Sequence, residues 1–288
     1  MDPLLIQLLI NGVAVGSIIA LSAVGLTLTF GILRLPNFAH GDFMTLGAYF
    51  TLMLNGAGLP IWLAVGGGGA LTIGGAMLTE QLVWQHLRDR RATSTTLIIT
   101  SLGLALFLRN GIILVWGAAN QAYNLPVVTA LEVGGIRIAY YRIVVVGLAM
   151  VAIAILHAIL QYTKVGKAMR AVADNIDLAR VSGINVERVI LWTWVLSMGL
   201  TAVGGSMYGL ITGVRPNMGW FLILPMFASV ILGGIGNPYG AIAGAFVIGI
   251  TQEVSTYWMP SEYKIAVALA LMVLVLLFKP QGLFQGTM

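Results

Sequence analysis

Few side chains in this sequence of 288 residues could take part in chemistry, and Asn37, His40 and Asp42 lie together in LPNFAHGD, residues 35–42. They offer an amide, an imidazole and a carboxylate in an otherwise apolar region. Such groups could line a polar path through the protein or its inner mouth. They could equally bond to backbone groups where a helix is broken, because a free N–H or C=O in lipid has to find a partner within the protein. The sequence alone leaves both interpretations open.

Three charged residues, Glu80, Arg109 and Glu253, fall in or near long apolar stretches. A charge inside a membrane is costly, and it is usually paired or faces a cavity. An ion pair between Arg109 and Glu80 is one interpretation, and contact with a transported substrate is the other. Cysteine is absent, and no Ser/His/Asp or metal-ligand grouping has the spacing of a catalytic site. We therefore predict no catalytic residue, metal or cofactor.

The longest polar stretch is KVGKAMRAVADNIDLARVSGINVERV, residues 164–189. Its apolar side chains recur every three or four residues, which predicts one helical face: Met169, Val172, Ala173, Ile176 and Ala179. Asp174 or Asn175 can cap a second short helix, and Gly183 can end it in a left-handed turn. We therefore expect one or two short amphipathic helices, followed by a long helix that Asn185 caps.

This polar stretch could lie in the lipid headgroups or could bind a soluble partner. A helix in the headgroups favours a strongly cationic face opposite bulky aromatic residues. The stretch instead mixes acidic with basic residues and has a small-residue apolar face, which suits a protein groove better. We therefore expect a docking surface formed by Lys167, Arg170, Asp174, Asp177, Arg180 and Gly183.

The composition identifies the class of fold. The chain is 59% hydrophobic and only 9% charged, with a mean hydropathy of +0.95, whereas soluble domains carry about 25% charged residues. A spanning helix needs about 20 mostly apolar residues. We predict an all-α, polytopic transmembrane bundle with about nine crossings, near 5–31, 42–56, 60–84, 95–116, 139–162, 188–212, 219–235, 240–259 and 263–279. Paired glycines, as in residues 66–69, 74–75 and 204–205, predict tight helix crossings.

The distribution of lysine and arginine predicts the orientation in the membrane, since cytoplasmic loops are enriched in both. Alternating the loops places ten on one side: Arg34, Arg88, Arg90, Arg91, Lys164, Lys167, Arg170, Arg180, Arg188 and Lys279. The other side receives Arg137, Arg142, Arg215 and Lys264. We therefore expect an N-terminus outside and a cytoplasmic C-terminus. This explains the formal charge of +5 better than binding of nucleic acid does.

A glycine-rich sequence, GGIGNPYG, occupies residues 233–240 between two predicted crossings. It does not fit the dinucleotide pattern G-x-G-x-x-G, and no sequence in the chain fits G-x-x-x-x-G-K-[ST]. We interpret it as a cytoplasmic turn. Gly234, Gly236 and Asn237 are candidates for an inner gate, and a simple packing turn is the alternative. The two flanking segments could also form a re-entrant pair.

These motifs together resemble one family of transport proteins. The shared stretches are NGVAVGSIIALSAVGLTLTFGIL (11–33), NFAHGDFMTLGAY (37–49), GKAMRAVADNIDLARVSGINVERV (166–189), AVGGSMYG (202–209), VILGGIGNPYGAIAGAFVIG (230–249) and FKPQGLFQG (278–286). The chain resembles, nearly end to end, the Liv-type permease subunits of ATP-binding-cassette importers for branched-chain and other neutral amino acids.

The resemblance implies a type II importer fold, with residues 1–288 as one transmembrane permease domain in a bacterial inner membrane. It implies four kinds of partner: a second and usually longer permease chain, two cytoplasmic ATPase subunits, a periplasmic solute-binding protein, and the lipid bilayer. It also implies that the loop at about 163–188 carries the coupling helix, near residues 166–183, which binds in the ATPase cleft. The chain itself would then not be an enzyme, because ATP hydrolysis would occur on a separate subunit.

Two alternatives stay open from the sequence. Related permeases carry urea or short amides, and the binding protein sets specificity in such systems. A secondary transporter driven by an ion gradient is a different class, but such proteins often carry buried acids and internal repeats. Here the core acids are few and no repeat is evident.

Overall fold

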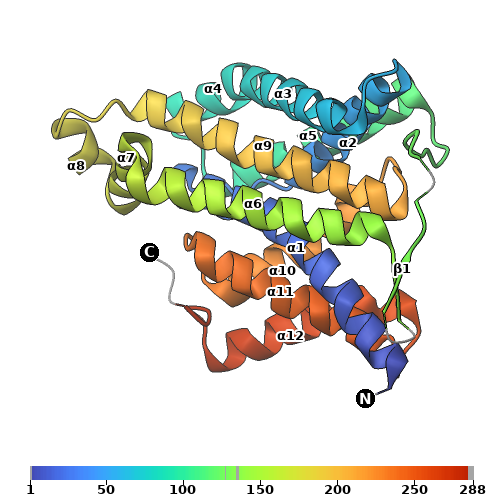
Figure 1. Cartoon of the computed structure of the whole chain (residues 1–288). Helices are drawn as coiled ribbons and strands as arrows, with labels where there is room; N and C mark the ends of the chain where they lie inside the picture. The colour runs from blue at the N-terminus through green and yellow to red at the C-terminus, as the bar shows by residue number, and fades with distance from the viewer. Residues whose placement is uncertain (1, 127, 134–135, 285–288) are drawn as a thin grey trace.

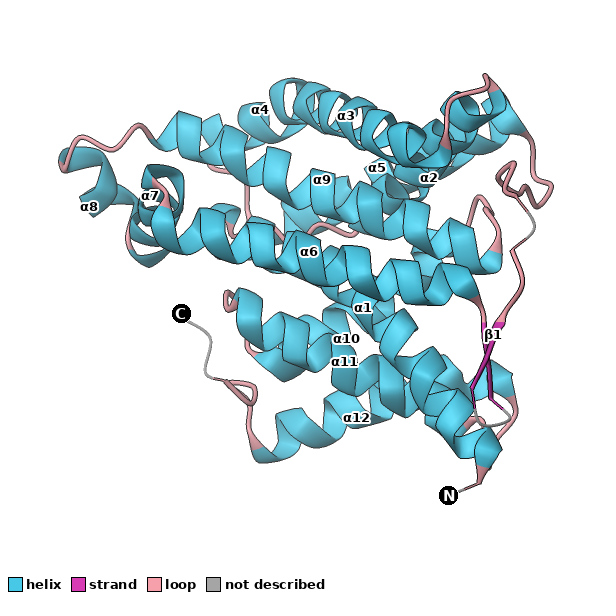
Figure 2. Cartoon of the chain, viewed as in Figure 1, coloured by secondary structure: helices cyan, strands magenta, loops and turns pink. Residues whose placement is uncertain are grey.

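The computed structural model describes residues 2–126, 128–133 and 136–284 as a bundle of long helices (Figures 1 and 2). The long helices are α1 (Pro3–Leu33), α2 (His40–Gly56), α3 (Ile61–Thr79), α5 (Ser94–Trp116), α6 (Tyr140–Tyr162), α9 (Val186–Thr212), α10 (Met218–Gly233), α11 (Pro238–Ser255) and α12 (Lys264–Phe278). The short elements are η1 (Glu80–Trp84), α4 (Gln85–Asp89), α7 (Lys164–Asp174), α8 (Ile176–Val181), η2 (Ser261–Tyr263), β1 (Leu131–Val133) and β2 (Ile136–Ile138). Residues 285 and 286 of the last family motif lie outside the described residues.

Each of the nine hydrophobic segments in the sequence contains one long helix. The largest difference is at the third, where the helical chain continues past Thr79 through a π-helical turn and α4 to Asp89. Six of the helical stretches are long and apolar enough to span a membrane by length and composition, and α10 is a shorter apolar helix. Helices α2 and α11 fall outside that set, so composition alone supports a multi-pass fold without fixing the number of crossings.

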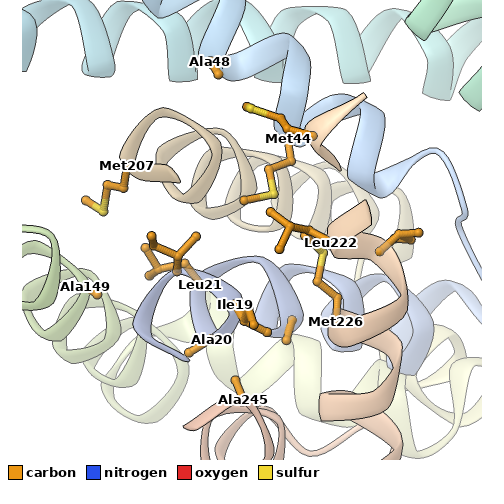
Figure 3. Packing of buried hydrophobic residues seen from close by; sticks show 14 of the residues in the cluster. Ile19, Ala20, Leu21, Met44, Ala48, Ala149, Met207, Leu222, Met226 and Ala245 are labelled. Carbon is orange, nitrogen blue, oxygen red and sulfur yellow. The ribbon is translucent and has the colours of Figure 1, made fainter. Parts of the chain in front are cut away.

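Helix α1 lies at the centre because it is apolar on every side. It packs against α6, α9, α10 and α11, and its middle residues from Gly16 to Thr29 are all buried. A helix that is hydrophobic all round has no face suited to water and is therefore buried. Figure 3 shows Ile19, Ala20 and Leu21 of α1 surrounded by side chains from several other helices: Met44, Ala149, Met207, Leu222, Met226 and Ala245.

One small β-hairpin departs from the expected all-α fold. Strands β1 and β2 pair antiparallel in the loop between α5 and α6, where Arg137 Nε lies 2.6 Å from Glu132 Oε1. In Figure 1 the hairpin lies at the opposite end of the bundle from α7 and α8. The preceding loop is held down by Tyr123, whose hydroxyl donates to the carbonyl oxygen of Ala48 (3.2 Å). Burial raises the pKa of the Tyr123 phenol above its usual range, so the hydroxyl stays neutral.

Candidate functional site

The chain between α1 and α2 is a non-helical segment in which Leu35, Asn37 and Ala39 are buried. Helix α1 ends at Arg34 in a left-handed conformation (φ 53°), and α2 begins only at His40. Within the segment, Asn37 Oδ1 accepts a hydrogen bond from the Ala39 N–H (3.1 Å). The Ser101 hydroxyl of α5 accepts one from the Phe38 N–H (3.2 Å). These contacts favour the interpretation that Asn37 satisfies a broken backbone.

His40 joins three helices at the centre of the bundle. Its Nε2 lies 2.9 Å from the carbonyl oxygen of Ser22 on α1 and 2.8 Å from the hydroxyl of Thr201 on α9. The side chain is fully buried and lines neither of the two larger cavities described below. Its contacts therefore indicate a structural junction of α1, α2 and α9.

Asp42 forms a buried ion pair with Arg109, which corrects the Arg109–Glu80 interpretation. Arg109 Nε and Nη2 donate to the two carboxylate oxygens of Asp42 at 3.0 and 3.1 Å, and the two side chains are 14% and 0% exposed. The guanidinium carbon also lies 4.4 Å from the ring centroid of Trp220. This arrangement connects α5 with α2 and α10. No pattern in the sequence predicted that Trp220 takes part.

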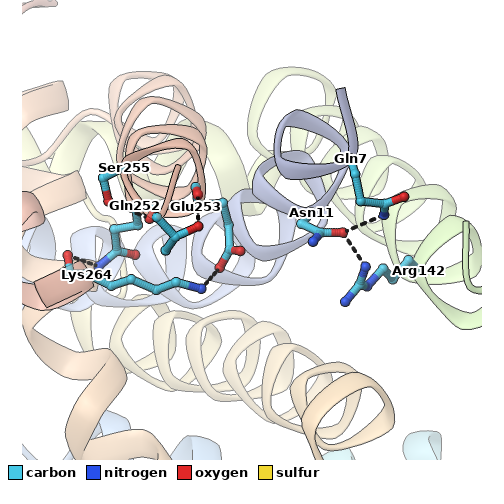
Figure 4. Close-up of polar contacts among 8 residues, drawn as sticks. Gln7, Asn11, Arg142, Gln252, Glu253, Ser255 and Lys264 are labelled. Carbon is cyan, nitrogen blue, oxygen red and sulfur yellow. Dashed lines mark hydrogen bonds and ion pairs between the residues drawn. The ribbon is translucent and has the colours of Figure 1, made fainter. Parts of the chain in front are cut away.

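Glu80 and Glu253 are also paired. Glu80 contacts Arg88, eight residues further along the chain, and accepts a hydrogen bond from Trp194 Nε1 on α9 (2.7 Å). Glu253 Oε1 lies 2.5 Å from Lys264 Nζ. Figure 4 shows this second pair together with a neighbouring contact between Arg142 and Asn11. These ion pairs indicate that Glu80 and Glu253 stabilise the fold and do not contact a transported substrate.

The GGIGNPYG sequence forms the turn between α10 and α11. Gly234 and Gly236 have positive φ angles of 103° and 88°. The Gly236 N–H donates to the Thr27 hydroxyl of α1 (3.0 Å). Asn237 Oδ1 caps α11 by accepting from the Tyr239 and Gly240 N–H groups (3.0 and 3.1 Å). All three gate candidates therefore have a local structural role in the turn.

The polar stretch forms two short helices, as expected. The prediction of its apolar face is wrong at one residue, Ile176. Met169, Val172 and Ala179 are buried, whereas Ile176 is 39% exposed. The reason is Asn175, which leaves the helical conformation (φ −152°, ψ 108°) and caps α8 by accepting from the Asp177 and Leu178 N–H groups. The break rotates α8 relative to α7, so one continuous helical periodicity does not apply.

The end of the stretch follows the predicted turn chemistry. Gly183 has a φ of 83°, a conformation that glycine adopts without steric cost. The Ile184 N–H donates to the Ala179 carbonyl oxygen (3.0 Å), which closes α8. Asn185 Oδ1 then caps α9 by accepting from the Arg188 N–H (3.0 Å). The predicted roles of Gly183 and Asn185 are therefore confirmed, as is the cap by Asn175.

All six residues expected to dock a partner are exposed: Lys167, Arg170, Asp174, Asp177, Arg180 and Gly183. Arg170 also donates to the carbonyl oxygen of Leu160 and ties α7 to the end of α6. Leu178 and Val181 on α8, which the sequence did not single out, are 60% and 81% exposed. The projection formed by α7 and α8 therefore presents apolar side chains beside charges of both signs.

Two larger cavities lie at opposite ends of the bundle. One, of 560 Å³, lies between α7, the end of α1 and the α10–α11 turn, and it brings Arg170 and Asp174 together with Gly236 and Asn237. The sequence did not predict that the polar stretch and the glycine-rich turn are neighbours. The other, of 480 Å³, is a cleft between the ends of α5 and α9 and the start of α10.

Apolar helices long enough to span a membrane, with the buried charges between them paired, define a multi-pass membrane protein. The chain belongs to the family described as branched-chain amino acid transport system / permease component, whose model matches residues 8–276.

Curated relatives match the chain over almost its whole length. LivH of Escherichia coli (strain K12), a high-affinity branched-chain amino acid transport system permease protein, is 32% identical over 96% of this chain and 94% of its own. BraD of Pseudomonas aeruginosa, with the same description, is 28% identical over 96% and 95%. Among solved structures, PsaBC from Streptococcus pneumoniae in complex with Fab matches with a TM-score of 0.54 and 15% identity, over 96% of this chain and 92% of that chain. That likeness concerns the fold alone.

Proposed function

We propose that the chain is one permease subunit of an ATP-driven importer of branched-chain and other neutral amino acids, a multi-pass protein of the bacterial inner membrane. The observation that carries this proposal is the match to LivH at 32% identity over 96% of the chain. A match of that length leaves no large region for a different activity, so residues 1–288 serve as a single permease domain. The urea and short-amide alternative is less favoured, because the named relatives carry branched-chain amino acids.

The second permease in this proposal is a different and longer chain. LivM of Escherichia coli (strain K12), also a branched-chain amino acid permease protein, is 24% identical over 91% of this chain but only 67% of its own length. That relation supports a pseudo-symmetric pair of unequal subunits. Two cytoplasmic ATPase subunits and a periplasmic solute-binding protein complete the complex, as family membership implies. ATP hydrolysis takes place on the ATPase subunits.

In this proposal the chain crosses the membrane nine times, with its N-terminus outside and its C-terminus in the cytoplasm. The alternation of nine helices and the excess of Lys and Arg on one side support it. The least regular crossing is α10, whose 16 residues extend about 24 Å, less than the roughly 30 Å hydrocarbon core.

The α7–α8 projection is the proposed coupling element. Met169 and Val172 anchor one side of α7, and the Arg170 contact with Leu160 fixes α7 to α6. The outer side of α8 offers Leu178 and Val181 beside Asp177 and Arg180. A firmly packed base and an exposed mixed surface suit a helix that binds in a groove of another protein and moves with it.

In this proposal the permease has two states, and the ATPase subunits and the binding protein contact each state differently. ATP binding closes the ATPase subunits, and their motion moves α7 and α8 as a rigid unit. Because α7 lines the same 560 Å³ cavity as Gly236 and Asn237, this motion changes the space beside the α10–α11 turn, which supports an inner-gate role for that turn. Neither permease state is favoured unless the ATPase or binding protein contacts it better than the other state.

Reconstitution tests the proposal. The chain, the second permease, the ATPases and the binding protein are placed in proteoliposomes, and leucine and urea uptake are measured with and without ATP. We expect leucine uptake that needs both ATP and the binding protein. A binding protein that takes urea but neither leucine nor alanine would overturn the substrate assignment. Uptake driven by an ion gradient without the ATPases would favour the secondary-transporter class.

A further inference from the structure

We propose that the 480 Å³ cleft is a binding site for a zwitterionic neutral amino acid, with Arg215 holding the carboxylate. The inference rests on the proposed function and adds a location and a recognition chemistry to it. The cleft lies at the end of the bundle opposite α7 and α8, where α5 and α9 end and α10 begins. In the proposed orientation this end faces the binding protein.

The cleft has the size and lining of a small-molecule site. Its volume lies within the range of about 300–1,000 Å³ that is usual for ligand pockets, which combine apolar walls with a few polar groups. Ile113, Met218 and Phe221 supply the apolar wall, and Asn120, Arg215 and Asn217 supply the polar groups.

Arg215 differs from Arg109 and Arg137 because its charge has no acidic partner among the described residues. Arg109 is paired with Asp42, and Arg137 with Glu132. Within residues 2–126, 128–133 and 136–284, Arg215 takes part in none of the four ion pairs, and no acidic side chain lines the cleft. A guanidinium presents parallel N–H donors that match a carboxylate. The cleft therefore favours a ligand with one carboxylate.

The remaining lining defines the rest of the ligand. The amide oxygens of Asn120 and Asn217 can accept hydrogen bonds from an ammonium group without adding a second charge. The apolar wall suits a branched alkyl side chain. Urea lacks both the carboxylate and the alkyl group, so it can use neither the charge of Arg215 nor the apolar wall.

The cleft also lies next to the buried ion pair. Ile113 is one helical turn beyond Arg109 on α5, and Phe221 directly follows Trp220, whose ring covers the Arg109 guanidinium. Since Asp42 already neutralises Arg109, Arg215 is left as the cation that lines the cleft itself.

Thiol labelling tests the site directly, because the chain contains no cysteine. Ala118, which lines the cleft, is replaced (Ala118→Cys) in the complete importer without its binding protein. The rate of maleimide labelling of this chain is then measured against leucine and leucinamide. We expect leucine to protect the thiol at millimolar concentration. Leucinamide should need at least a roughly tenfold higher concentration, because it cannot form the charge-assisted bond to Arg215.

The variant Arg215→Gln in the same background should raise the half-protecting leucine concentration at least about tenfold and abolish the difference between the two ligands. Arg215→Lys should retain part of that difference. Arg137→Gln, which removes an exposed cation at the same end, is the matched control and should change neither value. Labelling of Glu132→Cys on the hairpin should not respond to leucine.

Failure of this inference can be told apart from failure of the proposed function. The site assignment is overturned if leucine does not slow labelling of Ala118→Cys. It is also overturned if leucine protects this thiol at the same concentration with and without Arg215→Gln. Both results would count even where the reconstituted importer takes up leucine. If the importer takes up no leucine at all, the proposed substrate is wrong.

Discussion

At the scale of single residues, the ion pair between Asp42 and Arg109 carries a large desolvation cost. Two charges are removed from water, and the cost is offset only because the carboxylate accepts two hydrogen bonds and the guanidinium also contacts the Trp220 ring. Removing one partner leaves the other charge buried and alone. The pair therefore fixes the positions of α2, α5 and α10 relative to one another.

Replacing Asp42 with asparagine should destabilise the permease by about 3–5 kcal/mol, because Arg109 would remain buried without its counter-charge. The double variant Asp42→Asn, Arg109→Gln should recover part of that loss. Thermal unfolding of the purified subunit in detergent measures both changes.

The hairpin supplies the matched control for this prediction. Glu132 and Arg137 are paired at 2.6 Å but are 62% and 80% exposed, and exposed pairs contribute about 0–1 kcal/mol. Glu132→Gln should therefore leave the unfolding temperature nearly unchanged. If Asp42→Asn behaved like Glu132→Gln, the buried pair would not be holding the three helices together.

The sequence identified the charged residues within apolar segments but not their partners. A pair forms only when both residues lie at the same depth in the bundle. Glu80 directly follows α3, close to the end of the bundle at which α5 begins. Arg109 lies about 22 Å along α5 from its start at Ser94. Adjacent hydrophobic segments suggested a Glu80–Arg109 pair, but a linear sequence does not say how far into the bundle each residue lies. Asp42 follows a non-helical segment whose path no periodicity reveals.

At the scale of elements, α2 and α10 meet at a crossing that only glycine permits. A Cβ added to Gly41 would lie 2.3 Å from the carbonyl oxygen of Gly219, and one added to Gly219 would lie 1.7 Å from that of Gly41. The Gly219 N–H also donates to the Thr45 hydroxyl (3.0 Å). Small residues allow membrane helices to pack this closely, and here they bring Trp220 over Arg109.

Replacing Gly41 with alanine should cost at least about 1–3 kcal/mol, because the added methyl group meets backbone that cannot move aside. Gly103→Ala on α5 is the control, since nothing lies within 4 Å of its added Cβ; in a helix that change should be neutral or slightly stabilising. Thermal unfolding of the two variants measures the difference. Equal unfolding temperatures would show that α2 and α10 do not cross so closely.

Glycine runs were only partly informative at this scale. The prediction of a tight crossing is confirmed at Gly205, where an added Cβ would lie 2.0 Å from the Met44 carbonyl oxygen, and at Gly68 of the 66–69 run, where it would lie 2.3 Å from Thr51 Oγ1. It is wrong at Gly74, which has open space beside it. Composition gives the number of small residues, whereas the face on which each lies depends on the neighbouring helix. Helix caps were more predictable. Asn175, Gly183 and Asn185 begin or end helices through backbone groups only a few residues away, so no neighbouring helix is involved.

The α7–α8 projection gives the prediction for coupling. Asp177→Lys or Arg180→Glu should leave membrane insertion intact and abolish the stimulation of ATP hydrolysis by substrate-loaded binding protein, because each reverses a charge on the exposed face of α8. Hydrolysis by the assembled complex in proteoliposomes is the measurement.

Arg137→Glu, a charge reversal at the opposite end of the bundle, is the control for this prediction and should hydrolyse ATP like the parent. Parental rates of substrate-stimulated hydrolysis in the Asp177 and Arg180 variants would show that the projection is not the docking surface.

At the scale of the whole molecule, the hydrophobic segments predicted every long helix, and two of the nine proposed crossings depend on α10 and α11. These two helices share the turn that borders α7 across the 560 Å³ cavity. If α7 is cytoplasmic, the turn is also cytoplasmic, and both helices cross. The alternative is a re-entrant pair, in which the turn does not reach the cytoplasmic side and two crossings are lost.

Single cysteines distinguish these topologies, because the parent chain has none. In vesicles of known orientation, a membrane-impermeant maleimide should label Glu132→Cys and Met259→Cys only from outside, and Asp177→Cys and Ile235→Cys only from the cytoplasmic side. Ile235 is the decisive position because it lies within the α10–α11 turn itself, between Gly234 and Gly236. If Ile235→Cys were labelled from outside while Asp177→Cys was labelled from the cytoplasm, the nine-crossing topology would be wrong and α7 could not move the turn.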